Sequence, residues 1–225
     1  MTEGRVSTGI SELDALLGGG LERRVITQFY GDPGCGKSTL CQIAAVAVLR
    51  AGHSVVYFDP EGFSVERFRQ VAGADAEKLA ERLFLYEPLD FDQQGLLLSE
   101  SEKVLKRGKT GLLVMDSATV LYRAELSSGK EAQRKLARQV ILLLGLSRRY
   151  DLPVLITNQV YMDVVRNVSA PLGGTILSHL SKAIVRIEVH EGFRRAVLEK
   201  HRSLPAGGFF DFEITGNGIR AVSSP

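Results

Sequence analysis

The sequence predicts an α/β fold, with a mostly parallel sheet flanked by helices and an antiparallel extension at its C-terminal end. Three observations predict this fold. Strand-like runs alternate with helical patterns between residues 25 and 157, which is the order found in doubly wound sheets. These runs are apolar throughout, as in strands that are buried on both faces. Residues 183–222 instead show short alternating strands separated by glycine-containing turns.

The chain has the size and composition of one such unit. It holds 225 residues, of which 44% are hydrophobic and 24% are charged, and this is enough to bury one core. The sequence shows no internal repeat, low-complexity tract or interdomain linker. We therefore expect a single domain over residues 1–225.

Each element is predicted from its local pattern. Strands are expected over residues 25–30, 54–59, 83–86, 110–116 and 152–157, and in the extension over residues 183–189, 194–200, 209–214 and 219–222. Helices are expected from residue 39 onward and over residues 64–82, 93–106 and 131–150. Ser64 is suited to cap the second of these helices. The last helix shows Arg134 and Arg138 four residues apart on its polar face.

Residues 31–38 read Gly-Asp-Pro-Gly-Cys-Gly-Lys-Ser and match the phosphate-loop pattern Gly-x-x-x-x-Gly-Lys-[Ser/Thr] in full. The motif lies between a buried strand and the start of a helix, which is the context that it requires. Its glycines let backbone N–H groups face an anion at the helix N-terminus. Lys37 would reach the β- and γ-phosphates, and the Ser38 hydroxyl would ligate Mg²⁺. A nucleoside triphosphate site is therefore predicted, formed by Gly31, Asp32, Pro33, Gly34, Cys35, Gly36, Lys37, Ser38 and Thr39.

Polar residues follow three of the predicted strands, at the carboxyl edge of the sheet where such folds bind their ligands. Asp116 ends an apolar strand and suits the second Mg²⁺ anchor of phosphate-loop enzymes. Glu61 could orient and polarise an attacking water. Asp59 is its rival for this role, or else a structural hydrogen-bond acceptor. Gln159 either senses the γ-phosphate or caps the end of its strand.

Charge and cysteine content narrow the class of protein. Residues 1–115 carry a net charge of −3 and residues 116–225 a net charge of +5, so any polyanion contacts are expected in the second half. The only cysteines, Cys35 and Cys41, favour neither a disulfide framework nor a metal site. No apolar run approaches about 18 residues and no signal peptide is apparent. A cytoplasmic protein without membrane contact is therefore expected.

Several motifs together resemble the RecA/RadA recombinase family. They are the phosphate loop, the segments 57–62, 114–123 and 156–160, and the opening Val-Ser-Thr-Gly-Ile-Ser-Glu-Leu-Asp at residues 6–14. In order and spacing they span nearly the whole chain. Within this family the chain is similar to the archaeal RadB proteins, which are short paralogues of RadA. It begins at the ATPase core, so no N-terminal helix-hairpin-helix domain is expected.

The resemblance implies an ATPase that uses ATP and Mg²⁺. Lys37 and Ser38 match the residues that hold phosphate and Mg²⁺, and Asp116 matches the Mg²⁺-associated acid. Glu61 matches the catalytic glutamate of the family, which favours it over Asp59. Gln159 matches the glutamine that couples the γ-phosphate to a DNA-binding loop. The implied role is assistance of homologous recombination and DNA repair as an accessory to the main recombinase.

The resemblance also implies binding of single-stranded DNA without sequence specificity, a full-length RadA-type recombinase as partner, and room for a homo-oligomer. The two DNA loops of the family correspond to residues 123–133 and 161–175. The segment 200–202 could bind DNA, contact nucleotide from a neighbouring subunit, or be solvated. The DNA-binding residues expected on this basis are Arg123, Lys130, Arg134, Arg166, Lys200, His201 and Arg202.

One departure from the family pattern affects the expected rate. Pro60 stands where recombinases usually have Thr, beside Glu61, and its fixed φ and missing N–H predict slow hydrolysis. Two other functions stay open. The opening motif also resembles KaiC-like signalling ATPases, although these tend to carry paired glutamates after the second strand. The third hypothesis is an adaptor that binds ATP as a structural ligand without hydrolysing it.

Overall fold

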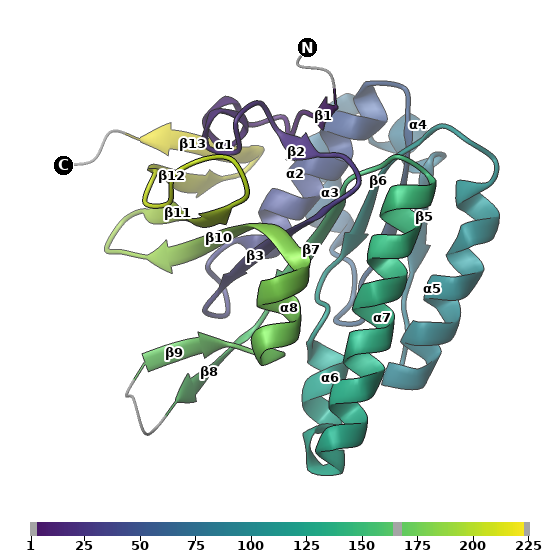
Figure 1. Ribbon diagram of the computed structural model, residues 1–225. Coiled ribbons are helices and arrows are strands. Elements are labelled where there is room, and N and C mark those ends of the chain that lie inside the picture. The colour runs from purple at the N-terminus through teal and green to yellow at the C-terminus, as the bar shows by residue number, and fades with distance from the viewer. Residues whose placement is uncertain (1–3, 164–167, 223–225) are drawn as a thin grey trace.

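The computed structural model describes residues 4–163 and 168–222 of the chain. Within these residues a nine-stranded sheet has the order β13-β12-β11-β10-β3-β7-β6-β4-β5 (Figure 1). Its strands are β3 (Ile26–Gly31), β4 (Ser54–Phe58), β5 (Leu83–Tyr86), β6 (Thr110–Met115), β7 (Val154–Asn158), β10 (Ser181–Val189), β11 (Arg194–His201), β12 (Phe209–Thr215) and β13 (Gly218–Val222).

The sheet has a parallel part and an antiparallel part, which confirms the predicted fold class. From β10 to β5 all neighbouring strands run parallel, whereas β10 to β13 pair antiparallel. Strand β3 lies between β10 and β7, and its last residue, Gly31, is in register with Ile187. The strand before the phosphate loop is therefore held on one side by a strand from the last third of the chain.

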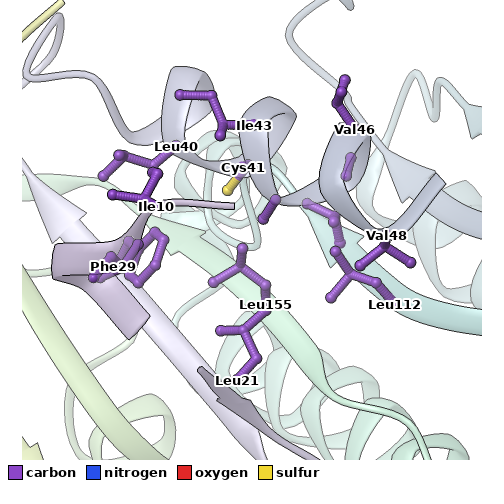
Figure 2. Close-up of a cluster of buried hydrophobic side chains, with 14 of the residues drawn as sticks. Ile10, Leu21, Phe29, Leu40, Cys41, Ile43, Val46, Val48, Leu112 and Leu155 are labelled. Carbon is purple, nitrogen blue, oxygen red and sulfur yellow. The ribbon is translucent and has the colours of Figure 1, made fainter. Parts of the chain in front are cut away.

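Helices cover both faces of the sheet, and each face buries its own hydrophobic cluster. On one face α2 (Lys37–Arg50) is buried along most of its length and packs against α3 (Val65–Ala72). Figure 2 shows side chains of α2, including Leu40 and Val48, above Phe29, Leu112 and Leu155 of the sheet. The other face is covered by α5 (Phe91–Leu105), α7 (Lys130–Arg149) and α8 (Gly174–Leu180).

The predicted helix over residues 64–82 is wrong in its length. Ser64 caps α3 as expected, because its Oγ accepts a hydrogen bond from the Arg67 N–H at 3.2 Å. The helix ends at Ala72, since Gly73 has a φ of 61°, which an α-helix does not accept. A 3₁₀ turn, η1 (Gly73–Asp75), and the short helix α4 (Ala76–Ala80) follow.

Short elements that the sequence analysis did not predict complete the fold. Strands β1 (Arg5–Val6) and β2 (Leu21–Glu22) form a small antiparallel pair on either side of α1 (Ser11–Leu16). Strands β8 (Val160–Asp163) and β9 (Val168–Pro171) form a second antiparallel pair, which projects from the main sheet in Figure 1. In the described part of the chain no helix is long and apolar enough to cross a membrane.

Candidate functional site

The loop between β3 and α2 has the backbone of an anion cradle. Gly34 and Gly36 have φ values of 74° and 107°, in the left-handed region that favours glycine. A Cβ on Gly36 would lie 3.0 Å from Ile214 Cδ1, so this glycine is also needed for packing. The loop lines a pocket of about 200 Å³ together with the start of α2 and Ile214 of β12.

The Lys37 side chain folds back over this loop. Its Nζ donates hydrogen bonds to the carbonyl oxygens of Gly31 and Asp32, both at 2.9 Å, and lies 3.6 Å from the Cys35 Sγ. Cys35 is buried beneath the loop, and burial raises the pKa of its thiol. The ammonium therefore stands at the pocket, whereas the thiol is a packing group. Ser38 is exposed at the first turn of α2, where its hydroxyl can reach a ligand.

Asp116, directly after β6, is a buried carboxylate held in a fixed orientation. Tyr57 donates its hydroxyl proton to Oδ2 at 2.9 Å, and Thr157 donates to Oδ1 at 2.6 Å. The Asp116–Ser117 peptide bond is cis. Because its two donors come from the neighbouring strands β4 and β7, the position of this carboxylate is set by the sheet itself.

Asp59 has the geometry of a structural acceptor. Its Oδ1 accepts hydrogen bonds from the backbone N–H groups of Glu61 and Gly62, both at 3.0 Å, which fixes the turn after β4. The side chain is buried, and burial, followed by the charge of Asp116, raises the pKa of Asp59 to about 7. Of the two alternatives left open for Asp59, this geometry favours the structural one and leaves Glu61 facing solvent.

The donor set fits a divalent cation bound together with phosphate. Among the described residues no cation pairs with Asp59 or Asp116, so their negative charge is uncompensated within the protein. The same residues contain no group of three His, Cys, Asp or Glu side chains able to form a metal cage. A phosphate-loop Mg²⁺ does not need one, because it is held by a hydroxyl, a carboxylate and the phosphates. Ser38 and Asp116 can supply the protein ligands.

Glu61, which follows β4, is connected through one oxygen to residues that follow β6 and β7. Its Oε1 accepts hydrogen bonds from Ser117 Oγ at 3.1 Å and from Gln159 Nε2 at 3.2 Å. Ser117 follows β6 and Gln159 follows β7. Two of the three predicted catalytic side chains, Glu61 and Gln159, are thus in direct contact although they stand 98 positions apart in the sequence.

Further hydrogen bonds extend from this contact to the segments at which DNA loops were predicted. Ser117 Oγ also accepts from the N–H of Val120, the first residue of α6 (Val120–Ala124). Thr119 Oγ1 donates to Asn158 Oδ1 at 2.9 Å and accepts from the Gln159 N–H. Asn158 Nδ2 in turn donates to the Leu172 carbonyl at 2.8 Å, just beyond β9.

The two predicted DNA loops have regular structure in the described residues. The first, residues 123–133, contains the end of α6, the 3₁₀ turn η2 (Leu126–Ser128) and the start of α7. The second, residues 161–175, contains the β8–β9 hairpin and the start of α8, while Arg166 lies outside the described residues. A pocket of about 470 Å³ lies between the two segments, with Arg123 and Tyr161 on its wall.

Comparison with known proteins places the chain in a family. The family model Rad51 matches residues 4–221. The chain belongs to the Rad51/RecA family. DNA repair and recombination protein RadB of Methanoculleus marisnigri is 63% identical over 224 residues, which are 99% of this chain and 100% of that protein. The RadB of Archaeoglobus fulgidus is 42% identical over 217 residues, or 95% and 97% of the two chains. The family resemblance predicted from the motifs is therefore confirmed.

Three predicted DNA-binding residues of this Rad51/RecA-family chain lie elsewhere. Lys200 Nζ donates to the backbone carbonyls of Ser178 and Ser181, so it caps the C-terminal end of α8. His201 Nδ1 accepts from the Ser203 N–H, and burial, with the charge of Arg5, lowers the pKa of His201. Arg202 pairs with Glu22 of β2. The structure does not bring these three side chains to the pocket between the loops. For Lys200 it favours a structural role.

The sequence analysis of this family member missed three contributors to the site. Ile214 of β12 lines the phosphate-loop pocket. Ser117 donates a hydrogen bond to Glu61 and accepts one from the first residue of α6, and Thr119 donates one to the last residue of β7. Ser117 and Thr119 stand within three residues of Asp116, so short hydroxyl side chains after a strand were the available signal. Ile214 carries no local signal, since only the tertiary fold brings it near the loop.

Proposed function

We propose that the chain is a slow ATPase that binds ATP and Mg²⁺ at the phosphate loop and associates with DNA through α6, the start of α7 and the β8–β9 hairpin. Family membership supports the first part, because Rad51/RecA-family proteins are in general ATPases. The relatives are named DNA repair and recombination proteins, which supports a role in homologous recombination and repair. We propose that it acts in the cytoplasm as an accessory to a full-length RadA-type recombinase.

The observation that carries this proposal is the shared oxygen of Glu61. Oε1 accepts from Ser117 and from Gln159, and these residues continue by hydrogen bonds to Val120 and Leu172 in the two proposed DNA segments. Glu61, the proposed catalytic side chain, is therefore joined to each segment through one intervening residue, Ser117 on one side and Gln159 on the other. This arrangement supports coupling between the nucleotide and DNA, because a change on either side alters the position of Glu61.

The residues support in-line attack of water on the γ-phosphate. Lys37 would leave the carbonyls of Gly31 and Asp32 for the phosphates, since a phosphate oxygen is the stronger acceptor for an ammonium. Ser38 and Asp116 would hold Mg²⁺, which neutralises charge that develops on the phosphates. Glu61 would accept a hydrogen bond from the attacking water and orient it. No step needs a covalent intermediate.

The geometry at Glu61 also supports slow turnover. Its backbone is fixed by Asp59 and follows Pro60, which has a restricted φ, so the side chain approaches the site from a rigid turn. Both donors to its carboxylate, Ser117 and Gln159, bond to Oε1, which fixes the direction in which the group can face a water. Both features favour an enzyme that needs DNA or a partner to reach its active geometry.

The pocket between the two segments supports binding of single-stranded DNA without sequence specificity. Arg123 can neutralise a phosphate, and Tyr161 is 45% exposed, so its ring can stack on a base. Lys130 and Arg134 are exposed on the adjoining end of α7. A homo-oligomer is compatible with this proposal, and Arg166, which lies outside the described residues, is a further candidate contact by its place in the sequence.

The test is ATP hydrolysis with and without single-stranded DNA across a salt series. Wild type is compared with Lys37→Ala, with Glu61→Gln, and with Glu66→Gln as a control, since Glu66 is an exposed glutamate on α3. We expect DNA stimulation that fades with salt, loss of ATP binding in Lys37→Ala, and binding without hydrolysis in Glu61→Gln. A rate of ATP hydrolysis that DNA does not change at low salt would favour the KaiC-like function. ATP binding without any hydrolysis would favour the adaptor.

A further inference from the structure

The exposed face of α7 carries a cationic stripe. At 100° per residue, six positions fall within an arc of about 80° opposite the buried side of the helix, and all six are exposed. These positions are Lys130, Arg134, Arg138, Ile141, Gly145 and Arg148. None of these six positions is acidic, although Glu131 borders the arc, and α7 itself runs in Figure 1 from the α6 end toward the opposite end of the sheet.

The cations of the stripe differ from the other cations of α7. Lys135 is paired with Asp92 and Glu125 at 2.9 and 3.1 Å, and Arg149 is paired with Glu102 at 2.6 Å. Within the described part of the chain no ion pair or hydrogen bond involves the side chains of Lys130, Arg134, Arg138 or Arg148. The cations on either side of the stripe are therefore paired with acidic residues, whereas the four cations of the stripe itself are unpaired among the described residues.

Helix stability does not account for these charges. Lys130 is the first residue of α7, where a cation opposes the positive end of the helix dipole. Arg134 and Arg138 stand at i, i+4, a spacing at which like charges repel. Only Arg148, in the last turn, has a favourable position relative to the dipole. A ligand outside the helix is a better account of the remaining three.

Gly145 gives an independent indication of such a ligand. Glycine weakens a helix interior, and it is normally tolerated there for close packing. A Cβ at Gly145 would meet nothing within 4 Å, so no neighbour among the described residues requires the glycine. Because Gly145 has no side chain, another molecule can come closer to the helix backbone at this point of the stripe, between Arg138 and Arg148.

We propose that this stripe binds the sugar-phosphate backbone of DNA and leads the DNA from the pocket at Arg123 along α7. This inference rests on the proposed function, which places DNA at α6 and the start of α7. Lys130 and Arg148 are 18 residues apart, so the stripe is about 27 Å long and matches about eight nucleotides at duplex rise. Arg24 is exposed just past its end, where its N–H bonds to the Leu152 carbonyl.

The test is the salt dependence of DNA binding by the full chain, measured by fluorescence anisotropy with labelled single-stranded and duplex 20-mers. The stripe variant is Arg138→Gln with Arg148→Gln. Its matched control is Arg69→Gln with Arg107→Gln, which removes two exposed, unpaired arginines from other surfaces of the described chain. Arg123→Gln reports on the loop pocket in the same assay. Thermal unfolding verifies that each variant is folded.

For duplex DNA each lost phosphate contact lowers the slope of log K against log salt by about 0.9, and for a single strand by about 0.7. We expect the stripe variant to lose about 1.8 in slope on duplex, or about 1.4 on a single strand, while the control keeps the wild-type slope. Between 50 and 200 mM salt the wild type should then lose roughly 12-fold more affinity for duplex than the variant, or roughly sevenfold more for a single strand.

The outcomes separate this inference from the proposed function. If Arg123→Gln weakens DNA binding while the stripe variant matches its control on both forms of DNA, the proposed path of DNA along α7 is wrong and the proposed function stands. An acidic protein surface would then be the alternative ligand of the stripe. If the stripe variant alone loses slope, DNA contacts the stripe but does not come from the pocket at Arg123, and the placement of DNA at that pocket is overturned. If the wild type binds neither 20-mer at 50 mM salt, both are overturned.

Discussion

Replacing Asp59 by Asn should change how the stability of the protein depends on pH. Asp59 is 5% exposed and lies close to the charge of Asp116, and these surroundings raise its pKa to about 7. In the unfolded chain an aspartate has a pKa of about 3.9. The folded state therefore retains a proton that the unfolded state releases, so the free energy of unfolding falls as pH rises from about 4 to about 7.

The magnitude follows from the two pKa values. Between pH 5 and pH 8 this single group should remove about 2.5 kcal/mol from the stability of the wild type, as an upper estimate. An Asn at this position cannot ionise, but its side-chain oxygen can still accept from the N–H groups of Glu61 and Gly62. Asp59→Asn should therefore gain stability relative to the wild type as pH rises.

The assay is urea unfolding at pH 5, 6, 7 and 8 without Mg²⁺ or nucleotide. Asp75→Asn serves as the control, because it removes one carboxylate from an exposed turn. The difference between Asp59→Asn and the wild type should grow with pH, while the difference for the control should stay level. If all three proteins lose or gain stability in parallel, Asp59 ionises normally in the folded state and the argument for two uncompensated carboxylates is refuted.

Three other substitutions test separate parts of the structure. Lys200→Met should lower the free energy of unfolding in urea by about 1–2 kcal/mol, because the carbonyls at the end of α8 lose their cap. The salt dependence of DNA binding should stay unchanged, and a smaller slope would restore Lys200 as a DNA contact. Gly31→Ala should cost about 2 kcal/mol or more in the same assay, since its Cβ would lie 2.2 Å from the Ile187 carbonyl oxygen, and a neutral result would contradict the close pairing of β3 with β10. Ser117→Ala should reduce DNA-stimulated ATP hydrolysis about fivefold to tenfold without changing ATP affinity, because Glu61 loses one of its two hydrogen-bond donors. If DNA stimulates the variant as much as the wild type, Ser117 has no part in the coupling.

Local features of the site were predictable because their causes are local. The phosphate loop needs glycines and a lysine at fixed spacing, and residues 31–38 provide them whatever the rest of the chain does. The strand-end positions of Glu61, Asp116 and Gln159 followed from apolar runs of strand length. The contact of Glu61 with Gln159 agrees with the rule that parallel strands end at one edge of the sheet.

Features that depend on distant partners were not predictable. The side chain of Lys200 bonds to carbonyls at residues 178 and 181, and no pattern around residue 200 indicates these partners. Ile214 enters the phosphate-loop pocket only because β12 and β3 share a sheet. The break at Gly73 was hidden by an apolar spacing that continues across it, although an isolated glycine there was the available warning. Tertiary pairing decided the surroundings of Lys200 and Ile214, whereas the break at Gly73 is a local effect of its φ.

The central place of β3 has a consequence for synthesis of the chain. The phosphate loop is complete at residue 38, but β3 acquires its β10 partner only when residue 187 has been made, about 150 residues later. At a synthesis rate of about 5–20 residues per second, this delay is roughly 8–30 s. The pocket wall at Ile214 arrives later still. If ATP binds at this loop as proposed, the stabilisation that it supplies would therefore act on the nearly finished polypeptide and not on the early chain.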